Sequence, residues 1–260
     1  MKTVSIYQVD AFTSELFGGN PAAVCPLGQW LPDQTMQDIA MENNLSETAF
    51  FVKKGESFDI RWFTPKSEID LAGHPTLATA HVIFKHLNYR KKEILFSSKS
   101  GLLRARRDKG LIQLDFPSRP PVEISPDASL TEALGKQPVK FYKSRDLMAL
   151  FATEKDIREL KPNFHLLSQV DMHGLIVTAT GEKSDFVSRF FAPSIGINED
   201  PVTGSAHATL IPFWAEKTGK DEMLAYQLSE RGGELFCQFG GERVFIAGKA
   251  VTFMIGEIRL

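Results

Sequence analysis

The sequence reads Asp59-Ile60-Arg61-Trp62-Phe63-Thr64-Pro65 in its first half and Phe186-Val187-Ser188-Arg189-Phe190-Phe191-Ala192-Pro193 in its second. Each stretch ends in Arg, two aromatic residues, a small residue and Pro, and the two final prolines lie 128 positions apart in a chain of 260 residues. A repeat spaced at about half the chain length is typical of an internal duplication. We therefore expect two homologous halves.

The segments around the two stretches also match. In each half an Asp, Asp70 or Asp200, is followed within four residues by Gly and then by a helix of small residues. Upstream, residues 31–52 predict a surface helix and then a strand, and residues 154–179 predict a helix, a linker and a strand. Downstream, each half closes with hairpin material, at 95–116 and 225–258. Matched elements in the same order favour a pseudo-twofold architecture.

One largely apolar helix is expected in each half. Residues 75–87 carry apolar side chains on most helical faces, so this helix is predicted to be buried. Its counterpart at 205–217 contains Pro212, which is expected to kink it or shift its start. A buried helix surrounded by strands predicts a barrel-like sheet wrapped around it, and hence an α+β fold with two pseudo-symmetric domains.

The proline-rich stretch 117–126 marks the expected boundary between the domains. The predicted domains are an N-terminal barrel half at 1–117 and a C-terminal barrel half at 118–260, with the last strand able to cross back to the N-terminal half.

The composition is that of an ordinary soluble globular protein, with 43% apolar and 24% charged residues and a net charge of −2. Neither nucleic acid nor a membrane is expected as a partner, because there is no basic stripe and no apolar stretch of ~18 residues. The N-terminus lacks the apolar core of a signal peptide, so a cytoplasmic location is expected. The two cysteines, Cys25 and Cys237, match no metal spacing and predict reduced, buried thiols.

Both buried helices begin at a glycine-containing turn, Gly73-His74-Pro75 in one half and Thr203-Gly204-Ser205 in the other. Helix N-termini expose unpaired N–H groups and carry partial positive charge, which suits a carboxylate or phosphate. If a twofold axis relates the halves, the two N-termini can face one cleft and hold a small anionic substrate from both sides. The alternative is that each glycine serves only the turn geometry.

Ionisable residues accompany these turns, namely Asp70, His74, Glu199 and Asp200. His74 can also be a cap or a surface residue, and Asp200 can be an N-cap before Pro201. Glu47 stands at the entry of an apolar strand, where it is either a solvent-facing charge or a carboxylate partly buried near the cleft. In the second case desolvation would let it take and return a proton near neutral pH. Dinucleotide-binding, P-loop, zinc-protease and serine-hydrolase motifs are absent from the sequence.

Five motifs taken together resemble the PhzF family of phenazine biosynthesis, in order and along essentially the whole chain. They are Gly18-Gly19-Asn20-Pro21-Ala22-Ala23-Val24, Leu45-Ser46-Glu47-Thr48-Ala49-Phe50, Phe63-Thr64-Pro65, Ala72-Gly73-His74-Pro75-Thr76 and Glu199-Asp200-Pro201-Val202-Thr203-Gly204-Ser205-Ala206. The resemblance implies a fold similar to diaminopimelate epimerase, with two pseudo-symmetric domains that are each a strand barrel around a central helix.

The resemblance also implies chemistry. The family's characterised member isomerises a dihydro-hydroxyanthranilate without a cofactor, and the motif's Glu, here Glu47, shuttles the proton. His74, Asp200 and Ser205 are implied to bind or orient the substrate, and Gly73 and Gly204 to supply backbone approach and N–H donors.

A homodimer is plausible from the family. Related epimerases use two catalytic thiols at the cleft positions of the two halves. Cys25 and Cys237 lie outside those motifs, so thiol racemisation is not expected.

We expect, on these grounds, a cofactor-independent isomerase that moves a proton within a small carboxylate-bearing molecule. Glu47, His74 and Asp200 would be catalytic, Gly73, Gly204 and Ser205 would bind substrate, and no metal is expected. The alternative is a non-catalytic protein that binds small anions on the same fold. A scaffold protein is a third possibility, which predicts large exposed apolar patches.

Overall fold

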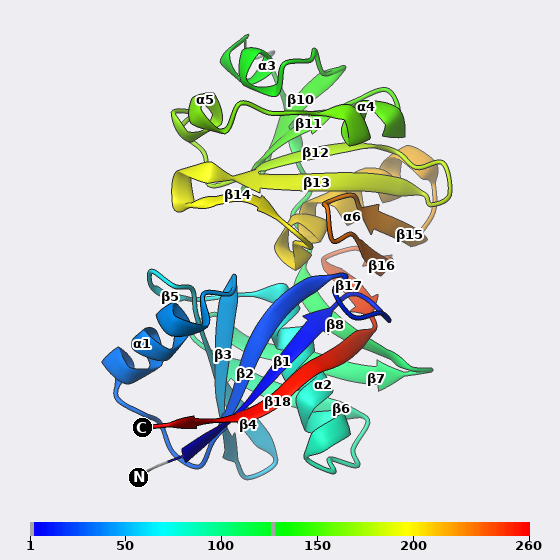
Figure 1. Cartoon of the computed structure of the whole chain (residues 1–260). Coiled ribbons are helices and arrows are strands. Elements are labelled where there is room, and N and C mark those ends of the chain that lie inside the picture. Colours follow the sequence, from blue (N-terminus) through cyan, green and yellow to red (C-terminus); the bar gives the residue numbers. More distant parts are fainter. Residues whose placement is uncertain (1–2, 126–127) are drawn as a thin grey trace. The chain divides into compact units, whose positions relative to one another are not determined.

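The computed structural model describes residues 3–125 and 128–260, which divide into two units (Figure 1). Unit 1 comprises the chain up to Asp115 together with Ala247–Leu260, and unit 2 comprises Phe116–Ile246. Pro126, the predicted end of the linker, lies outside the described residues, and within the predicted linker the chain forms a short strand, β9.

The first half of the chain and the C-terminal strand supply the elements of unit 1. They are β1 (Thr3–Ala11), β2 (Asn20–Leu27), α1 (Asp33–Asn43), β3 (Glu47–Lys54), β4 (Ser57–Phe63), β5 (Glu68–Ile69), α2 (Gly73–His86), β6 (Glu93–Ser98), β7 (Gly101–Asp108), β8 (Leu111–Pro117) and β18 (Ala250–Arg259).

The second half supplies the elements of unit 2. They are β9 (Val122–Ile124), α3 (Ala128–Leu134), β10 (Lys140–Lys143), β11 (Leu147–Leu150), α4 (Glu154–Glu159), α5 (Phe164–Ser168), β12 (Leu175–Thr180), β13 (Phe186–Ala192), the 3₁₀ turn η1 (Pro193–Ile195), β14 (Ile197–Asp200), α6 (Gly204–Thr218), β15 (Glu222–Gln227), β16 (Gly233–Gly240) and β17 (Arg243–Gly248).

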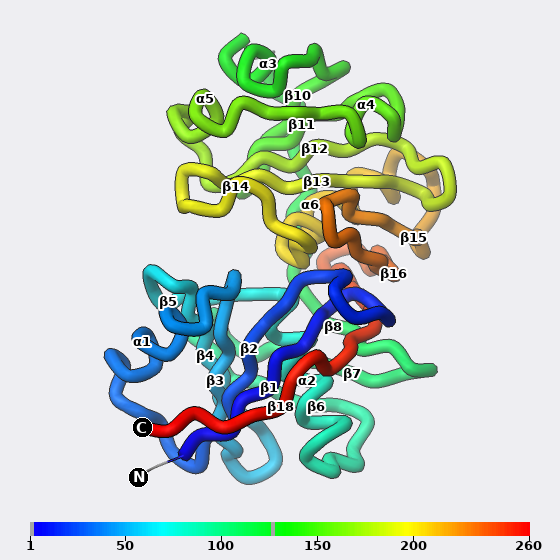
Figure 2. The backbone as a smooth tube through the Cα atoms, viewed as in Figure 1, coloured from blue at the N-terminus to red at the C-terminus, as the bar shows by residue number. Residues whose placement is uncertain are grey.

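The strand pairings repeat from one unit to the other. In unit 1, β2 and β3 pair parallel, β3 and β4 antiparallel, and β4 and β6 parallel. In unit 2, β11 and β12 pair parallel, β12 and β13 antiparallel, and β13 and β15 parallel. The antiparallel series β18–β1–β2 matches the series β9–β10–β11. The predicted α+β fold with two pseudo-symmetric halves is confirmed by these pairings, and Figure 2 traces the backbone through both units.

The repeated residues make equivalent contacts in the two units. Arg61 on β4 forms a bidentate ion pair with Glu68, with N···O distances of 2.7 and 2.8 Å. Arg189 on β13 does the same with Glu199, at 2.7 and 2.9 Å. Each guanidinium also lies over the second aromatic ring of its repeat, 5.2 Å from the centroid of Phe63 in unit 1 and 5.0 Å from the centroid of Phe191 in unit 2. Glu199, one of the candidate ionisable groups beside the turns, is therefore held in a structural ion pair.

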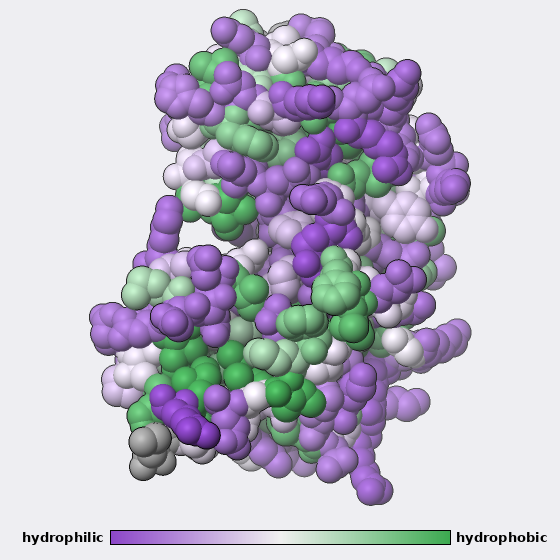
Figure 3. Space-filling model, in the orientation of Figure 1, coloured by the Kyte–Doolittle hydropathy of each residue, from purple (hydrophilic) through white to green (hydrophobic). Residues whose placement is uncertain are grey.

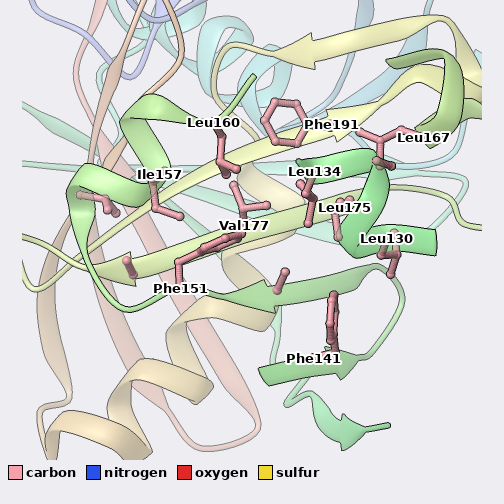
Figure 4. Packing of buried hydrophobic residues seen from close by; sticks show 14 residues of the cluster. Leu130, Leu134, Phe141, Phe151, Ile157, Leu160, Leu167, Leu175, Val177 and Phe191 are labelled. Atoms are coloured by element: carbon pink, nitrogen blue, oxygen red, sulfur yellow. The ribbon is translucent and has the colours of Figure 1, made fainter. Parts of the chain in front are cut away.

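Each unit has its own apolar core. In unit 1, Val4 and Ile6 of β1 pack with Met36 and Ile39 of α1 and with Phe50 of β3. In unit 2, residues of β11 to β13 pack beneath α3, α4 and α5, as Figure 4 shows for Leu134, Phe151, Ile157, Val177 and Phe191. Burial of apolar surface on this scale is the main stabilising contribution to such domains.

The two central helices differ slightly from the prediction. Helix α2 begins at Gly73, so Pro75 is its third residue, where the backbone N–H would have no partner in the helix anyway. Helix α6 runs from Gly204 to Thr218 with Pro212 inside it, so the proline does not shift its start. Pro212 leaves the carbonyl of Ala208 without its usual donor, and the backbone N–H of Arg119 donates to that carbonyl instead, at 2.9 Å.

Among the residues that the structure describes, no helix combines the length and the apolar character needed to cross a membrane.

Candidate functional site

Glu47 and His74, two of the predicted site residues, meet in unit 1. His74 Nε2 lies 3.1 Å from Glu47 Oε2, and the side chains are 5% and 13% exposed. On the other side of the imidazole, Nδ1 lies 3.0 Å from the amide nitrogen of Asn20, which is fully buried. Of the two interpretations of Glu47, the structure shows the largely buried carboxylate and not a solvent-facing charge.

Three element starts bring these side chains together. Asn20 is the first residue of β2, Glu47 the first of β3, and His74 the second of α2. The parallel register sets Glu47 opposite Ala22 on β2, two residues from Asn20. Helix α2 packs against both strands, so its first turn reaches the strand ends where Asn20 and Glu47 begin.

Burial keeps the His74 imidazole neutral at physiological pH. Desolvation lowers its pKa from 6.5 to about 3, and a hydrogen bond to the backbone of Pro21 offsets only part of that effect. A neutral imidazole has a single N–H, so Nε2, 3.1 Å from Glu47 Oε2, can either donate to an ionised Glu47 or accept from a protonated one, depending on which ring nitrogen carries the hydrogen. The ring does not itself gain or lose a proton in either case. The Glu47 carboxyl is therefore the group that can take up a proton and release it.

The backbone turn that leads into Asn20 requires a glycine at position 19. Its backbone is left-handed, with φ +61°, and a Cβ at this position would lie 2.1 Å from the carbonyl oxygen of Ala11 and 2.8 Å from Thr13. Position 19 therefore disfavours any residue with a side chain for two reasons: the left-handed backbone conformation and the lack of room for a Cβ atom.

Gly19→Ala is expected to lower the free energy of unfolding by about 3 kcal/mol or more, as measured by urea unfolding. Gly55→Ala is the matched control, because Gly55 has φ +59° but a Cβ added to it would meet no atom within 4 Å. The control should cost only about 1 kcal/mol, the conformational part alone. Equal costs for the two variants would show that the close approach to Ala11 does not matter.

Unit 2 holds the second group of predicted residues. Asp200, at the end of β14, is 8% exposed, and its Oδ2 accepts a hydrogen bond from the Thr203 hydroxyl at 2.5 Å. Gln227, at the end of β15, accepts from the Thr203 N–H at 2.8 Å and donates to the Asp200 carbonyl at 2.8 Å. These bonds fix the turn that leads into α6, so the Asp200 carboxyl is held at the start of that helix.

A buried histidine supports the same turn. His207 Nδ1 lies 2.9 Å from the carbonyl oxygen of Thr203, and the side chain is fully buried. Desolvation lowers its pKa from 6.5 to about 4, so the ring is neutral at physiological pH and Nδ1 donates to the carbonyl. Gly204 is the buried first residue of α6, and Ser205 follows it half-buried.

The two core helices begin without side-chain caps. Neither Ala72 before α2 nor Thr203 before α6 makes a capping hydrogen bond through its side chain. In contrast, Thr153 and Asp156 form a complete capping box on α4, and Asn163 caps α5. Gly73 and Gly204 are buried, and a buried uncapped helix start provides N–H donors for an anionic ligand.

Sequence reasoning missed Asn20 and Gln227. Asn20 belongs to the motif that begins Gly18-Gly19-Asn20, and its polar side chain between glycine and an apolar strand was the available signal. Gln227 lies far from any motif and becomes visible only through its bonds to Asp200 and Thr203. Asp70 does not join the site: it is exposed and accepts a hydrogen bond from Ser100 at 3.3 Å.

The two thiols are buried and unreactive in character. Cys25 and Cys237 are 0% and 3% exposed, and desolvation raises the pKa of Cys25 to about 12 and that of Cys237 further still. A thiolate, the form needed for racemisation by cysteine, is therefore strongly disfavoured at both positions. Within the described ranges, no three His, Cys, Asp or Glu side chains gather in a way that could hold a metal ion.

Comparison with known proteins places this site in context. The family model for phenazine biosynthesis-like proteins, PhzC-PhzF, matches residues 9–256. An uncharacterized isomerase of Pseudomonas aeruginosa is 50% identical over 258 residues, which is 99% of each chain. The human phenazine biosynthesis-like domain-containing protein is 41% identical and covers 97% of this chain and 98% of its own.

Solved structures agree. A PhzF-family protein of Enterococcus faecalis is 46% identical, with a TM-score of 0.98 over 100% of both chains. A hydroxyproline epimerase of Agrobacterium vitis shares the fold alone, at 12% identity and a TM-score of 0.65 over 98% of this chain and 92% of its own. The predicted class of enzyme, an isomerase, is confirmed by the named relatives. The chain belongs to the phenazine biosynthesis-like PhzC-PhzF family.

Proposed function

We propose that this protein isomerises a small carboxylate-bearing molecule by moving one proton with Glu47, without a cofactor. The observation that carries the proposal is the buried Glu47–His74 contact of 3.1 Å beside a neutral imidazole. Glu47 as carboxylate removes a proton from a carbon next to an electron-withdrawing group, the double bond shifts, and the same carboxyl returns the proton to another carbon. The number of protons and electrons is unchanged, as an isomerisation requires.

His74 and Asn20 would orient the carboxyl group. Asn20 holds one side of the imidazole, so the other side stays aimed at Glu47 Oε2. The second carboxyl oxygen of Glu47 would then face the substrate. Catalysis by such a placed general acid and base typically contributes about 10²–10⁴-fold.

Substrate binding would use the uncapped starts of α2 and α6. The N–H groups at Gly73 and Gly204 and the hydroxyl of Ser205 would hold the carboxylate, and Asp200 would bind a polar group of the substrate or assist the transfer.

The test is deuterium incorporation. The enzyme is incubated in D₂O with a panel of small cyclic and unsaturated carboxylates, and each compound is followed by mass spectrometry and NMR. Incorporation of one deuterium at a carbon of a compound that also isomerises supports the proposal. Saturable binding of a carboxylate with neither exchange nor isomerisation across the panel would favour the non-catalytic anion-binding protein.

We also propose that the protein works as a homodimer. Phe17 and Phe253 pack edge to face on unit 1, with ring centroids 5.9 Å apart. Their chain neighbours Leu16, Met254 and Ile255 are also exposed apolar residues, and all five, which we call the β18 patch, are between 40% and 68% exposed. Figure 3 shows apolar surface along this side of unit 1. A patch of this kind is what a scaffold protein would show, and we assign it to contact with a second copy.

Ile255→Lys is expected to convert a dimer into a monomer in sedimentation experiments, because a charge would be buried in the contact. Leu102→Lys is the control, since Leu102 is 54% exposed on β7 of the same unit, outside the β18 patch. A wild-type protein that sediments as a monomer, or a dimer indifferent to Ile255→Lys, contradicts this assignment.

A further inference from the structure

A second concave site lies at the opposite end of α2 from His74. It is a groove of about 590 Å³ within unit 1, lined by the last turns of α2, the segment before β6 and the β7–β8 hairpin. We call it the basic groove; its lining includes His81, Phe84, Lys85, Arg90, Lys92, Arg107, Asp108 and Lys109. His74 precedes Lys85 by eleven residues, about three helical turns, so the basic groove is separate from the Glu47–His74 pair.

Positive charge is concentrated in this groove. Lys85, Arg90, Lys92, Arg107 and Lys109 line it with one carboxylate, Asp108, although the whole chain has a net charge of −2. Across the described residues, the salt bridges include none made by these five cations. Nearby cations do have acidic partners, since Lys91, Lys99 and Arg104 pair with Glu56, Glu68 and Glu93.

One of the five cations is held in place by the chain itself. The Arg107 guanidinium lies 4.8 Å from the centroid of the Phe84 ring and donates from one amino nitrogen to the Arg90 carbonyl at 2.9 Å. Its backbone N–H donates to the Lys92 carbonyl at 2.9 Å. Arg107 is half-buried and retains further N–H donors in a planar fork, the arrangement that suits phosphate oxygens.

Unit 2 provides an internal comparison. The corresponding groove, of about 580 Å³, lies between α6 and the β16–β17 hairpin and is lined by Pro212, Ala215, Glu216, Asp221, Phe239 and Glu242 among others. Glu216 stands 131 positions after Lys85, the same offset that relates Gly204 to Gly73. The fold therefore forms this groove in both units but does not require cations there, since the second copy carries three carboxylates and no Lys or Arg.

We propose that the basic groove binds a small ligand with several adjacent phosphate groups, such as inorganic polyphosphate or the phosphate chain of a nucleotide. Five cations around one concavity exceed what a single carboxylate or phosphate needs. The groove is an open concavity of about 590 Å³, a volume that suits a small molecule, whereas an extended nucleic acid calls for a basic stripe. This site is independent of the proposed isomerisation.

The proposal is tested by titration calorimetry of the full chain with tripolyphosphate, ATP and orthophosphate at low salt. Saturable binding of one tripolyphosphate per chain is expected, at least about tenfold tighter than orthophosphate. Equal affinities for ATP and tripolyphosphate would identify the phosphate chain as the recognised part, and tighter ATP binding would identify a nucleotide. Absent binding of both, or equal affinity for orthophosphate, overturns the proposal, as does tighter binding of a single-stranded oligonucleotide.

Two variants locate the binding. Lys85→Glu with Lys92→Glu, which replaces two cations of the basic groove by carboxylates, should weaken tripolyphosphate binding at least about tenfold. Lys53→Glu with Lys54→Glu changes the net charge equally at an exposed place on β3, outside the groove, and should keep most of the affinity. If both double variants lose the same affinity for tripolyphosphate, binding depends only on the net charge of the protein and not on the basic groove. Arg107→Lys keeps the charge but loses the planar fork, and an affinity equal to wild type would remove Arg107 from the site.

Discussion

Glu47→Gln is expected to lower the rate of deuterium exchange by about 10²–10⁴-fold while the protein stays folded and still binds carboxylates. Glutamine fills the same space and can still contact His74, but its amide cannot take up and return a proton. The carboxylate that this variant removes is 3.1 Å from His74 and largely buried, so no water-filled route readily replaces it. Exchange is measured in D₂O by mass spectrometry at saturating substrate.

Glu42→Gln is the matched control for this variant. Glu42 is exposed near the end of α1 in the same unit, so the replacement removes the same charge away from the site. Its exchange rate should equal that of the wild type. If Glu47→Gln exchanges as fast as Glu42→Gln, Glu47 is not the proton carrier, and His74 or a bound water would have to be tested next.

The repeat was the most informative feature of the sequence, because it predicted equivalent elements in the two halves, and the structure shows that the repeated residues make equivalent contacts as well. Arg61 and Arg189 occupy equivalent positions of the sequence repeat. In the structure each forms an ion pair with a glutamate and lies over the second aromatic ring of its own repeat. Such contacts repeat together with the sequence because the arginine and its glutamate lie within about ten residues of each other in each unit.

Hydrogen-bond partners that lie far apart in the chain could not be predicted from the sequence. The contact between Asn20 and His74 joins residues 54 positions apart, and the bonds of Gln227 to Thr203 bridge 24 positions. Nothing in one sequence links such positions before the strand register is known. The same holds for the Ala208 carbonyl, which lacks its usual helical donor because of Pro212: it accepts a hydrogen bond from the backbone N–H of Arg119, 89 positions earlier in the chain.

As the pH falls, the protein is expected to lose stability already at pH values well above those at which carboxylates titrate. Burial lowers the pKa of His74 to about 3 and those of His81 and His207 to about 4, each from 6.5. Between pH 6.5 and about 4 the unfolded chain therefore binds up to three more protons than the folded chain. Their contribution to stability is complete above pH 6.5 and is lost as the pH falls toward the folded-state values.

The expected slope is about 1.4 kcal/mol per pH unit for each histidine, so the three together can remove about 4 kcal/mol per unit at the steepest point. Urea unfolding at pH 7.5, 6.5, 5.5 and 4.5, followed by tryptophan fluorescence, measures it. Carboxylates with lowered pKa values, such as Glu68 and Asp156, act in the same direction but at lower pH, because their ordinary values are 4.5 and 3.8.

His207→Phe separates the histidine effect from that of the carboxylates. The imidazole packs 6.0 Å from the Phe186 ring, so a phenyl group can occupy the same buried space. The variant loses the bond to the Thr203 carbonyl and should be less stable at pH 7.5, yet its slope between pH 6.5 and 4.5 should fall by about 1.4 kcal/mol per unit. His165→Phe, at an exposed position on α5, is the control. An unchanged slope in His207→Phe would mean that this ring takes up its proton equally in the folded and unfolded chain, and that its burial does not couple acid to unfolding.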